Sequence, residues 1–176
     1  MSLTNRLTGT PERSMNGGRR SKLTAVWFTA MEKIPRDFRE FLRLLNAEGV
    51  EYLLIGGYAV GHYGFPRATA DMDIWIAIHP DTAKRMVSAL LKFGFRPDQI
   101  DTETFLEKGR IIRMGVPPMR IEVLNDISGV KFAECYARRN MIEIGGTPVS
   151  LISLDDLKRN KKAAGRYKDL EDLENL

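Results

Sequence analysis

The chain has 176 residues, of which 43% are hydrophobic and 28% charged, a composition typical of one globular domain. Its single cysteine, Cys135, excludes an internal disulfide and a cysteine-built zinc site, and is typical of the reducing cytoplasm. The sequence has no apolar run of secretory type and no segment long enough to span a bilayer, so a soluble cytoplasmic protein without a membrane partner is expected.

Charge is unevenly placed along the chain. The formal net charge is +4, and residues 1–34 account for all of it, with six basic and two acidic residues. The neutral remainder gives little support for long-range attraction to a nucleic acid polymer. Residues 1–20 are rich in Ser, Thr, Gly, Arg and Asn without an apolar period, which predicts disorder. We therefore divide the chain into an N-terminal extension (1–34), disordered or arising from a start codon placed too early, a core (35–152) and a C-terminal helical tail (153–176).

Apolar spacing and turn residues predict helices and strands in alternation. A helix is expected between Pro35 and Gly49, because apolar residues recur there at i, i+3, i+4 and i+7. A second should run from Pro80 to Gly94, with these residues facing inward: Ala83, Val87, Leu90 and Leu91. Other helices are expected near 58–63, near 130–138 and in the tail, which should bend at Gly165. The expected strands are 51–55, 71–78, 110–114, 119–124, 141–144 and 147–151, the last four forming two hairpins. This order predicts an α+β fold, a small mixed sheet with helices packed on it.

Two aspartates stand at the head of a strongly apolar strand. Asp71 and Asp73 are two residues apart, so they share a face, with Cα atoms roughly 6–7 Å apart. Their repulsion is on the order of 2–3 kcal/mol at an effective dielectric of about 20. The opposite face is wholly apolar and the strand looks central, so exposure to open water explains the pair less well than a bound cation does.

A third carboxylate repeats this pattern on a later strand. Glu122 faces away from its apolar neighbours Ile121 and Val123. If the two strands are neighbours, three carboxylates converge on one face, and a divalent cation such as Mg²⁺, which prefers oxygen ligands, would relieve their repulsion. The alternative is that Glu122 pairs with one of three arginines on a solvated sheet face: Arg110, Arg113 or Arg120.

The segment before the aspartates supplies candidate phosphate contacts. Gly56 and Gly57 follow a strand and precede a helix, so their N–H groups can approach a phosphate, or the pair forms only a tight turn. Arg67 could contact a phosphate and Thr69 could donate a hydroxyl hydrogen bond. Taken alone, Arg67 is more typical of a solvated loop arginine.

The tail offers two further cations. Lys161 and Arg166 could reach a phosphate. The neighbouring charges at Lys168, Asp169 and Asp172 could equally be surface pairs along a helix. The residues alone leave both interpretations of the tail open.

Taken together, these motifs resemble the nucleotidyltransferase superfamily that shares the DNA polymerase beta-type palm core. The matching residues are Gly56-Gly57 between strand and helix, Asp71-Met72-Asp73 on the next strand, and the later Glu122, where many relatives have Asp. The run from Arg67 to Asp73 and the tail sequence NKKAAGRYKDLED (160–172) are similar to a small bacterial branch. That branch includes AbiEii-type toxins of toxin–antitoxin systems and stand-alone nucleotidyltransferases. The resemblance covers roughly residues 35–176.

The resemblance implies transfer of a nucleoside monophosphate from an NTP to an acceptor, which could be a protein, an RNA or a small molecule. Asp71 and Asp73 would hold the metal that binds the triphosphate, Mg²⁺ or Mn²⁺. Together with Glu122 they would hold a second metal, and Glu122 would take the proton of the acceptor. The expected nucleotide contacts are Gly56, Gly57, Arg67, Thr69, Lys161 and Arg166.

Three functions remain open from the sequence. The first is a metal-dependent nucleotidyltransferase, and the second is a non-catalytic interaction module, for example a component that binds a cognate partner in a toxin–antitoxin pair. The third is an RNA-modifying variant that holds its acceptor with the basic residues 1–34. The intact set of three carboxylates favours the first.

Overall fold

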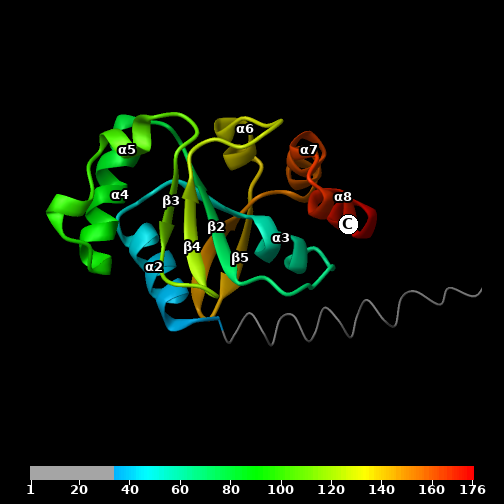
Figure 1. Cartoon of the computed structure of the whole chain (residues 1–176), viewed down its shortest axis with the longest axis horizontal. Helices are drawn as coiled ribbons and strands as arrows, with labels where there is room; N and C mark the ends of the chain where they lie inside the picture. The colour runs from blue at the N-terminus through cyan, green and yellow to red at the C-terminus, as the bar shows by residue number, and fades with distance from the viewer. Residues whose placement is uncertain (1–33) are drawn as a thin grey trace, which may run out of the picture.

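A computed structural model describes residues 34–176, so the expectations for residues 1–33 lie outside the described part of the chain. Its centre is a six-stranded sheet with the order β3-β4-β2-β1-β6-β5 (Figure 1). The strands are β1 (Tyr52–Ile55), β2 (Asp71–Ile76), β3 (Ile111–Met114), β4 (Arg120–Leu124), β5 (Asn140–Ile144) and β6 (Thr147–Leu151). The α-helices are α2 (Arg36–Ala47), α3 (Gly56–His62), α4 (Pro80–Phe93), α5 (Glu103–Leu106), α6 (Phe132–Ala137), α7 (Leu154–Ala164) and α8 (Tyr167–Asn175).

Strand β2 lies in the middle of the sheet, as its apolar sequence predicted. It pairs antiparallel with β1 and parallel with β4. Strands β1 and β6 are also parallel, while β3–β4 and β5–β6 are the two antiparallel hairpins expected from their turn sequences. The sheet is therefore mixed, and the predicted fold class is confirmed.

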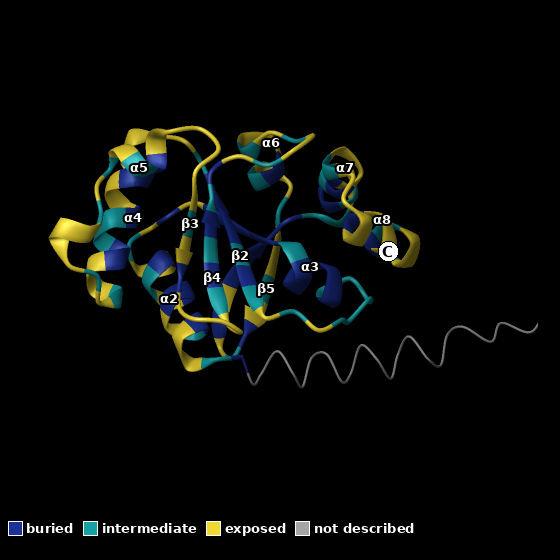
Figure 2. Cartoon of the chain, viewed as in Figure 1, coloured by how far each residue is buried: buried dark blue, intermediate teal, exposed yellow. Residues whose placement is uncertain are grey.

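Helices cover both faces of the sheet. Helices α2 and α4 pack together on one side, where the rings of Phe41 and Phe93 lie 5.2 Å apart, and α3, α7 and α8 lie on the other side (Figure 1). The buried stripe of α2 has the predicted members: Phe38, Phe41, Leu42 and Leu45. Buried residues concentrate in the central strands and on the inward faces of these helices (Figure 2). Ile34, which we assigned to the N-terminal extension, belongs to this core.

Three local details differ from the sequence expectations. In helix α4, Ala83 and Leu90 are buried as predicted, but Met86 and Ala89 are buried as well, while Val87 is half-buried and Leu91 exposed, because the core-facing stripe is shifted slightly around the helix. Strand β2 ends at Ile76, two residues early, since the chain turns outward before Pro80 begins α4. A 3₁₀ turn (Pro97–Gln99) and the short α5, anchored by buried Phe105, were not predicted.

The tail is a pair of helices with the predicted bend. The Ser153 hydroxyl accepts a hydrogen bond from the backbone N–H of Asp156 and so caps the start of α7. Gly165 ends α7 in the left-handed conformation, at φ +63°. Helix α8 then folds back against α7, beside α3 (Figure 1). Within residues 34–176, no helix is both long enough and apolar enough to cross a membrane.

Candidate functional site

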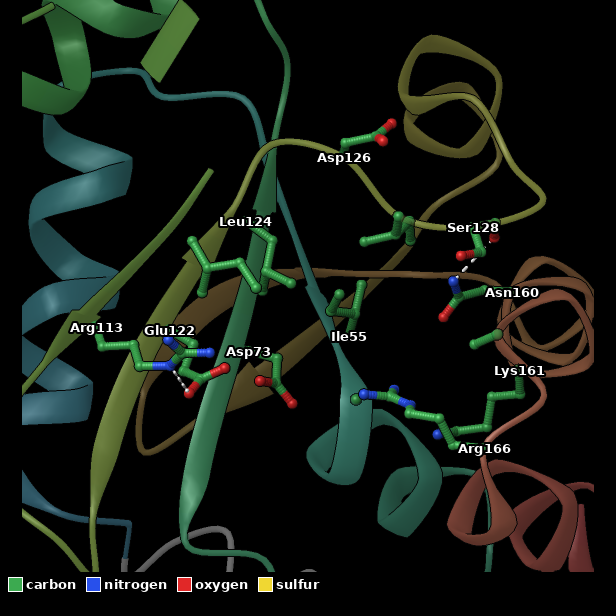
Figure 3. A pocket seen from close by; sticks show the side chains of 14 residues that line it. Ile55, Asp73, Arg113, Glu122, Leu124, Asp126, Ser128, Asn160, Lys161 and Arg166 are labelled. Carbon is green, nitrogen blue, oxygen red and sulfur yellow. Dashed lines mark hydrogen bonds and ion pairs between the residues drawn. The ribbon is translucent and has the colours of Figure 1, made fainter. Parts of the chain in front are cut away.

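A pocket of about 390 Å³ opens where β2 and β4 meet the tail (Figure 3). Five of the predicted site residues line it: Gly56, Asp73, Glu122, Lys161 and Arg166. The other four lie outside its lining: Gly57, Arg67, Thr69 and Asp71. The structure therefore brings residues from β2, β4, α3 and the tail to one place, although they are far apart in the sequence.

The parallel pairing of β2 and β4 sets two carboxylates side by side. Asp73 is the register partner of Glu122, and Asp71 is the partner of Arg120. Neighbouring strands lie roughly 4.8 Å apart, and register partners point to the same face. Asp73 and Glu122 therefore share the pocket, while Asp71 lies on the same face two residues earlier.

Arginines neutralise two of the three carboxylates. The guanidinium of Arg120 donates through Nε and Nη2 to the two carboxylate oxygens of Asp71, both at 3.3 Å. Arg113, the register partner of Glu122 on β3, donates from Nε to Glu122 Oε1 at 2.8 Å. The pairing of Glu122 with an arginine, an alternative that the sequence left open, is thus present in the structure.

Asp73 is the exception. Its backbone pairs in the sheet, but its carboxylate makes no hydrogen bond or ion pair with any residue of the described chain. Burial above all, with the negative charges of Glu122 and Asp71, raises its pKa to about 6, against the opposing effect of Lys161 and Arg166. A carboxyl group of this kind has unused capacity to bind a cation.

The glycines allow α3 to approach the aspartate strand closely. Gly56 adopts φ +63°, and a Cβ atom on it would lie 1.9 Å from Asp73 Oδ2. A Cβ on Gly57 would lie 2.4 Å from Thr69 Oγ1, whose hydroxyl donates to the Asp71 carbonyl at 3.3 Å. Gly56 thus touches the pocket, whereas Gly57 and Thr69 pack against each other behind it.

Arg67 lies in an ion-pair network with the tail, rather than in the pocket. Its guanidinium donates hydrogen bonds from Nε and Nη2 to the two carboxylate oxygens of Asp172, with N–O distances of 2.7 and 3.0 Å. Lys161 Nζ lies 2.8 Å from both Asp169 and Asp172, and Arg166 Nε lies 2.6 Å from Asp169. We call these five residues the tail network. Asp169 and Asp172 are buried, so their interpretation as surface residues is wrong.

Within the network, Lys161 and Arg166 differ in availability. The side chain of Lys161 is 5% exposed and lies between two carboxylates, whereas that of Arg166 is 77% exposed. Both nevertheless line the pocket opposite Asp73 (Figure 3). Arg166 is therefore the cation that solvent and a ligand can reach, although it is paired with buried Asp169, while Lys161 contributes its positive field from a fixed position.

Several lining residues were missed by the sequence reasoning. Arg113 was named only as one of three possible partners of Glu122, and the predicted hairpin, which places the two directly opposite each other, could have singled it out. Asp126 and Asn160 have no such local signal, because they meet only when α7 packs beside the loop after β4. The apolar lining completes the set: Ile55, Ile111, Leu124, Ile127 and Ala164.

The carboxylates have the donor chemistry for a divalent cation but are not gathered around one point. Among residues 34–176, no group of three or more His, Cys, Asp or Glu side chains is arranged to hold a metal ion. Carboxylate oxygens suit Mg²⁺ and Mn²⁺, and Asp73 lacks a cationic partner of its own. Arg113 and Arg120 would have to release Glu122 and Asp71 for all three to coordinate a cation.

Comparison with known proteins supports the fold. No family model matches the chain, and no curated protein matches it. A solved structure from Thermotoga maritima, described as a "putative nucleotidyltransferase", matches with a TM-score of 0.53 and 17% sequence identity. The match covers 79% of this chain and 89% of that one. At this identity the likeness concerns the fold alone, so the chain has a nucleotidyltransferase-like fold.

Proposed function

We propose that the protein is a metal-dependent nucleotidyltransferase, which moves a nucleoside monophosphate from an NTP to an acceptor. The observation that carries this proposal is the pairing of Asp73 with Glu122 in one pocket of a nucleotidyltransferase-like fold. A structural role explains Asp73 poorly, because its half-buried carboxylate has no hydrogen-bond or ion-pair partner among the described residues. A bound cation would supply the missing partner of this carboxylate.

Asp71, Asp73 and Glu122 would hold the cation, Mg²⁺ or Mn²⁺. When bound, such a cation neutralises the triphosphate and polarises the phosphorus that is attacked. Arg113 and Arg120 must then turn away from their carboxylates. The Arg120–Asp71 pair, with side chains 35% and 32% exposed, is of the partly exposed kind that is worth about 1 kcal/mol or less. Glu122 is only 16% exposed, so opening its pair with Arg113 is the more costly of the two changes.

The remaining groups would position the nucleotide and the acceptor. Gly56 lets the backbone come close to a phosphate, while Lys161 and Arg166 place positive charge opposite Asp73. The acceptor oxygen or nitrogen would attack the α-phosphorus, the bond to the bridging oxygen would break, and pyrophosphate would leave. Glu122 would receive the acceptor's proton. Arg67, Thr69 and Gly57 would support these groups from outside the pocket.

One observation favours a second candidate, the non-catalytic interaction module, such as a partner-binding component of a toxin–antitoxin pair. Arginines already neutralise Asp71 and Glu122, which is what a protein that binds no cation there would need. The two candidates differ in what Asp73 does, since only the enzyme requires its carboxylate.

Label transfer separates the candidates. The protein is incubated with Mg²⁺, cell extract and NTPs labelled on either the α- or the γ-phosphate. We expect label to reach an acceptor from the α position only, and Asp73→Asn to reduce that labelling by about 100-fold or more. Asp98→Asn is the matched control, because Asp98 carries the same charge in an exposed ion pair with Arg96. Equal labelling by the parent and Asp73→Asn would contradict the proposal.

A further inference from the structure

Three neighbouring strands place one positive and two negative side chains in a row. Asp73 on β2 is the register partner of Glu122 on β4, and Glu122 is in turn the partner of Arg113 on β3. Register partners point to the same face of a sheet, and neighbouring strands lie roughly 4.8 Å apart. The three side chains therefore lie side by side in the lining of the pocket, with Arg113 on the edge strand (Figure 3).

Arg113 uses only part of its capacity to donate hydrogen bonds. Its Nε–H group donates to Glu122 Oε1 at 2.8 Å. A guanidinium has five N–H donors, and within residues 34–176 the four on Nη1 and Nη2 have no protein partner. The side chain is half exposed and lines the pocket. Arg113 can therefore offer several donors to a ligand that enters the pocket.

A cation bound to Glu122 would change what attracts Arg113. Without a ligand, the carboxylate of Glu122 neutralises the guanidinium. If the Mg²⁺ of the proposed function takes this carboxylate, the two cations compete for it and repel each other. The triphosphate that accompanies Mg²⁺ brings several negative charges into the same pocket, and phosphate oxygens are acceptors to which a guanidinium binds strongly. A phosphate would thus replace the partner that Arg113 loses.

We propose that Arg113 is a phosphate ligand of the nucleotide and that it exchanges Glu122 for a phosphate oxygen when the cation binds. This inference rests on the proposed nucleotidyltransferase function. Arg113 would act from the edge of the sheet, across the pocket from Lys161 and Arg166 of the tail (Figure 3). The phosphates would then lie between cations from two walls of the pocket.

Arg120 provides a matched comparison within the same sheet. It donates two hydrogen bonds to Asp71, both at 3.3 Å, but it does not belong to the pocket lining. Both arginines compete with a cation for a carboxylate, so their removal should have a similar effect on the binding of Mg²⁺ alone. Only Arg113 lines the pocket, so only its removal should weaken the binding of a nucleotide.

Calorimetric titrations of the full chain separate these two effects. Mg²⁺ alone is titrated into the parent, Arg113→Gln and Arg120→Gln, and we expect both variants to bind it as tightly as the parent or a few-fold more tightly. The NTP that binds the parent most tightly is then titrated with Mg²⁺ saturating each protein. Arg113→Gln should bind it about tenfold to hundredfold more weakly, because a charge-assisted hydrogen bond is lost. Arg120→Gln should match the parent, and Arg113→Lys, which keeps the charge, should lie between.

A measurement without metal tests the exchange itself. Glu122→Gln releases Arg113 in the absence of a cation, so in EDTA this variant should bind the same NTP several-fold more tightly than the parent does. Loss of a negative charge also favours the NTP, and the double variant Glu122→Gln/Arg113→Gln keeps that benefit without the arginine. The double variant should bind about tenfold more weakly than Glu122→Gln. Arg113→Gln alone should cause a smaller loss relative to the parent, where Glu122 holds the arginine.

The possible failures are distinguishable, once melting curves have shown that the variants fold. If Arg113→Gln binds the NTP as tightly as the parent under saturating Mg²⁺, or if the double variant binds as tightly as Glu122→Gln, Arg113 only neutralises Glu122. The inference is then wrong while the transferase proposal stands. If no NTP binds the parent and no label is transferred, both proposals are wrong.

Discussion

Aspartates that are buried or half-buried occur in two regions of this molecule, and their surroundings differ. In the tail, Asp156, Asp169 and Asp172 each contact two cationic side chains at 2.6–3.2 Å. Burial opposes their ionisation, but the neighbouring guanidinium and ammonium groups outweigh it and hold the pKa of each below its ordinary value. In the pocket, Asp73 has no such partner among the described residues, and burial together with the charges of Glu122 and Asp71 raises its pKa to about 6.

The difference distinguishes a structural carboxylate from a candidate functional one. A buried charge is tolerated when its partners come from the protein itself, and the tail network supplies them for Asp169 and Asp172. Asp73 is half-buried beside the like charges of Glu122 and Asp71, and no cation of the described chain is in contact with it. Its ionised form is therefore stabilised when a cation binds from outside. The residue type is the same in the two regions, but the tail aspartates are buried and ion-paired, whereas Asp73 is half-buried and has no cation within hydrogen-bonding distance among the described residues.

The largest expected effect comes from breaking the tail network. Asp172→Asn removes the charge that Arg67 and Lys161 share, leaving both cations without one of their partners in a buried setting. We expect the free energy of unfolding to fall by about 3–5 kcal/mol, the range for breaking a buried ion pair. Urea denaturation at pH 7 measures the change.

The surface variant Asp98→Asn calibrates that measurement. Asp98 and Arg96 form an ion pair with side chains that are 68% and 71% exposed, and such pairs are worth less than about 1 kcal/mol. A loss for Asp172→Asn no larger than that for Asp98→Asn would show that the tail network is not what holds α8 in place.

A second change tests the approach of α3 to the pocket. Gly56→Ala should lower the free energy of unfolding by about 2–4 kcal/mol, because φ +63° disfavours alanine and the new Cβ would lie 1.9 Å from Asp73 Oδ2. Gly146→Ala is the matched control, since Gly146 has φ +77° and a Cβ added there would meet nothing within 4 Å. It should lose only the conformational part, about 1–2 kcal/mol. Equal losses would mean that Asp73 moves aside freely.

Much of the site could be predicted because its signals are local in the sequence. The alternation around Asp71 and Asp73 gave the central strand, and the turn at Gly115–Pro118 gave the hairpin that carries Glu122. Strand periodicity then placed the carboxylates on one face. Helix α4 was predicted in extent and in part of its inward face: Ala83 and Leu90 are buried, whereas Leu91 is exposed, since overlapping apolar stripes satisfy the same period.

The partners of these residues were not predictable in the same way. Arg67 and Asp172 are 105 positions apart, and only the packing of α8 beside the loop before β2 brings them together. Asn160 meets the loop of Ser128 for the same kind of reason. Charge pairing between remote segments leaves no period or spacing in the sequence, so Arg67 was assigned to phosphate when its contact is the tail.

The third prediction concerns Asp73 itself and has the opposite sign to the first. Asp73→Asn keeps the size and removes a charge that burial disfavours. In EDTA at pH 7 the variant should be more stable than the parent by up to about 3 kcal/mol, from a pKa raised by about two units. Loss of stability instead would assign Asp73 a structural role like that of Asp172.

The pH dependence gives this prediction a sharper form. The folded pKa of Asp73 lies above its ordinary value, so the ionised carboxylate lowers the free energy of unfolding. This loss is absent below about pH 4, grows between about pH 4 and 6, and is constant above about pH 6. The advantage of Asp73→Asn over the parent should follow that course in urea denaturation. The tail carboxylates act in the other direction, because their lowered pKa values give stability that is lost as pH falls below about 4.

The smallest expected effect concerns the arginine that covers Asp71. Arg120→Gln removes an ion pair whose two side chains are 35% and 32% exposed, so stability should change by less than about 1 kcal/mol. The difference should disappear in about 1 M salt, where the Debye length is about 3 Å. Under the proposed function, the variant should also bind Mg²⁺ as tightly as the parent or a few-fold more tightly, because a competing cation has been removed. Melting curves with and without Mg²⁺, at low and high salt, measure both effects. A variant that loses more than about 2 kcal/mol at any salt concentration would make Arg120 a structural partner of Asp71, and Asp71 would then belong with the paired carboxylates of the tail.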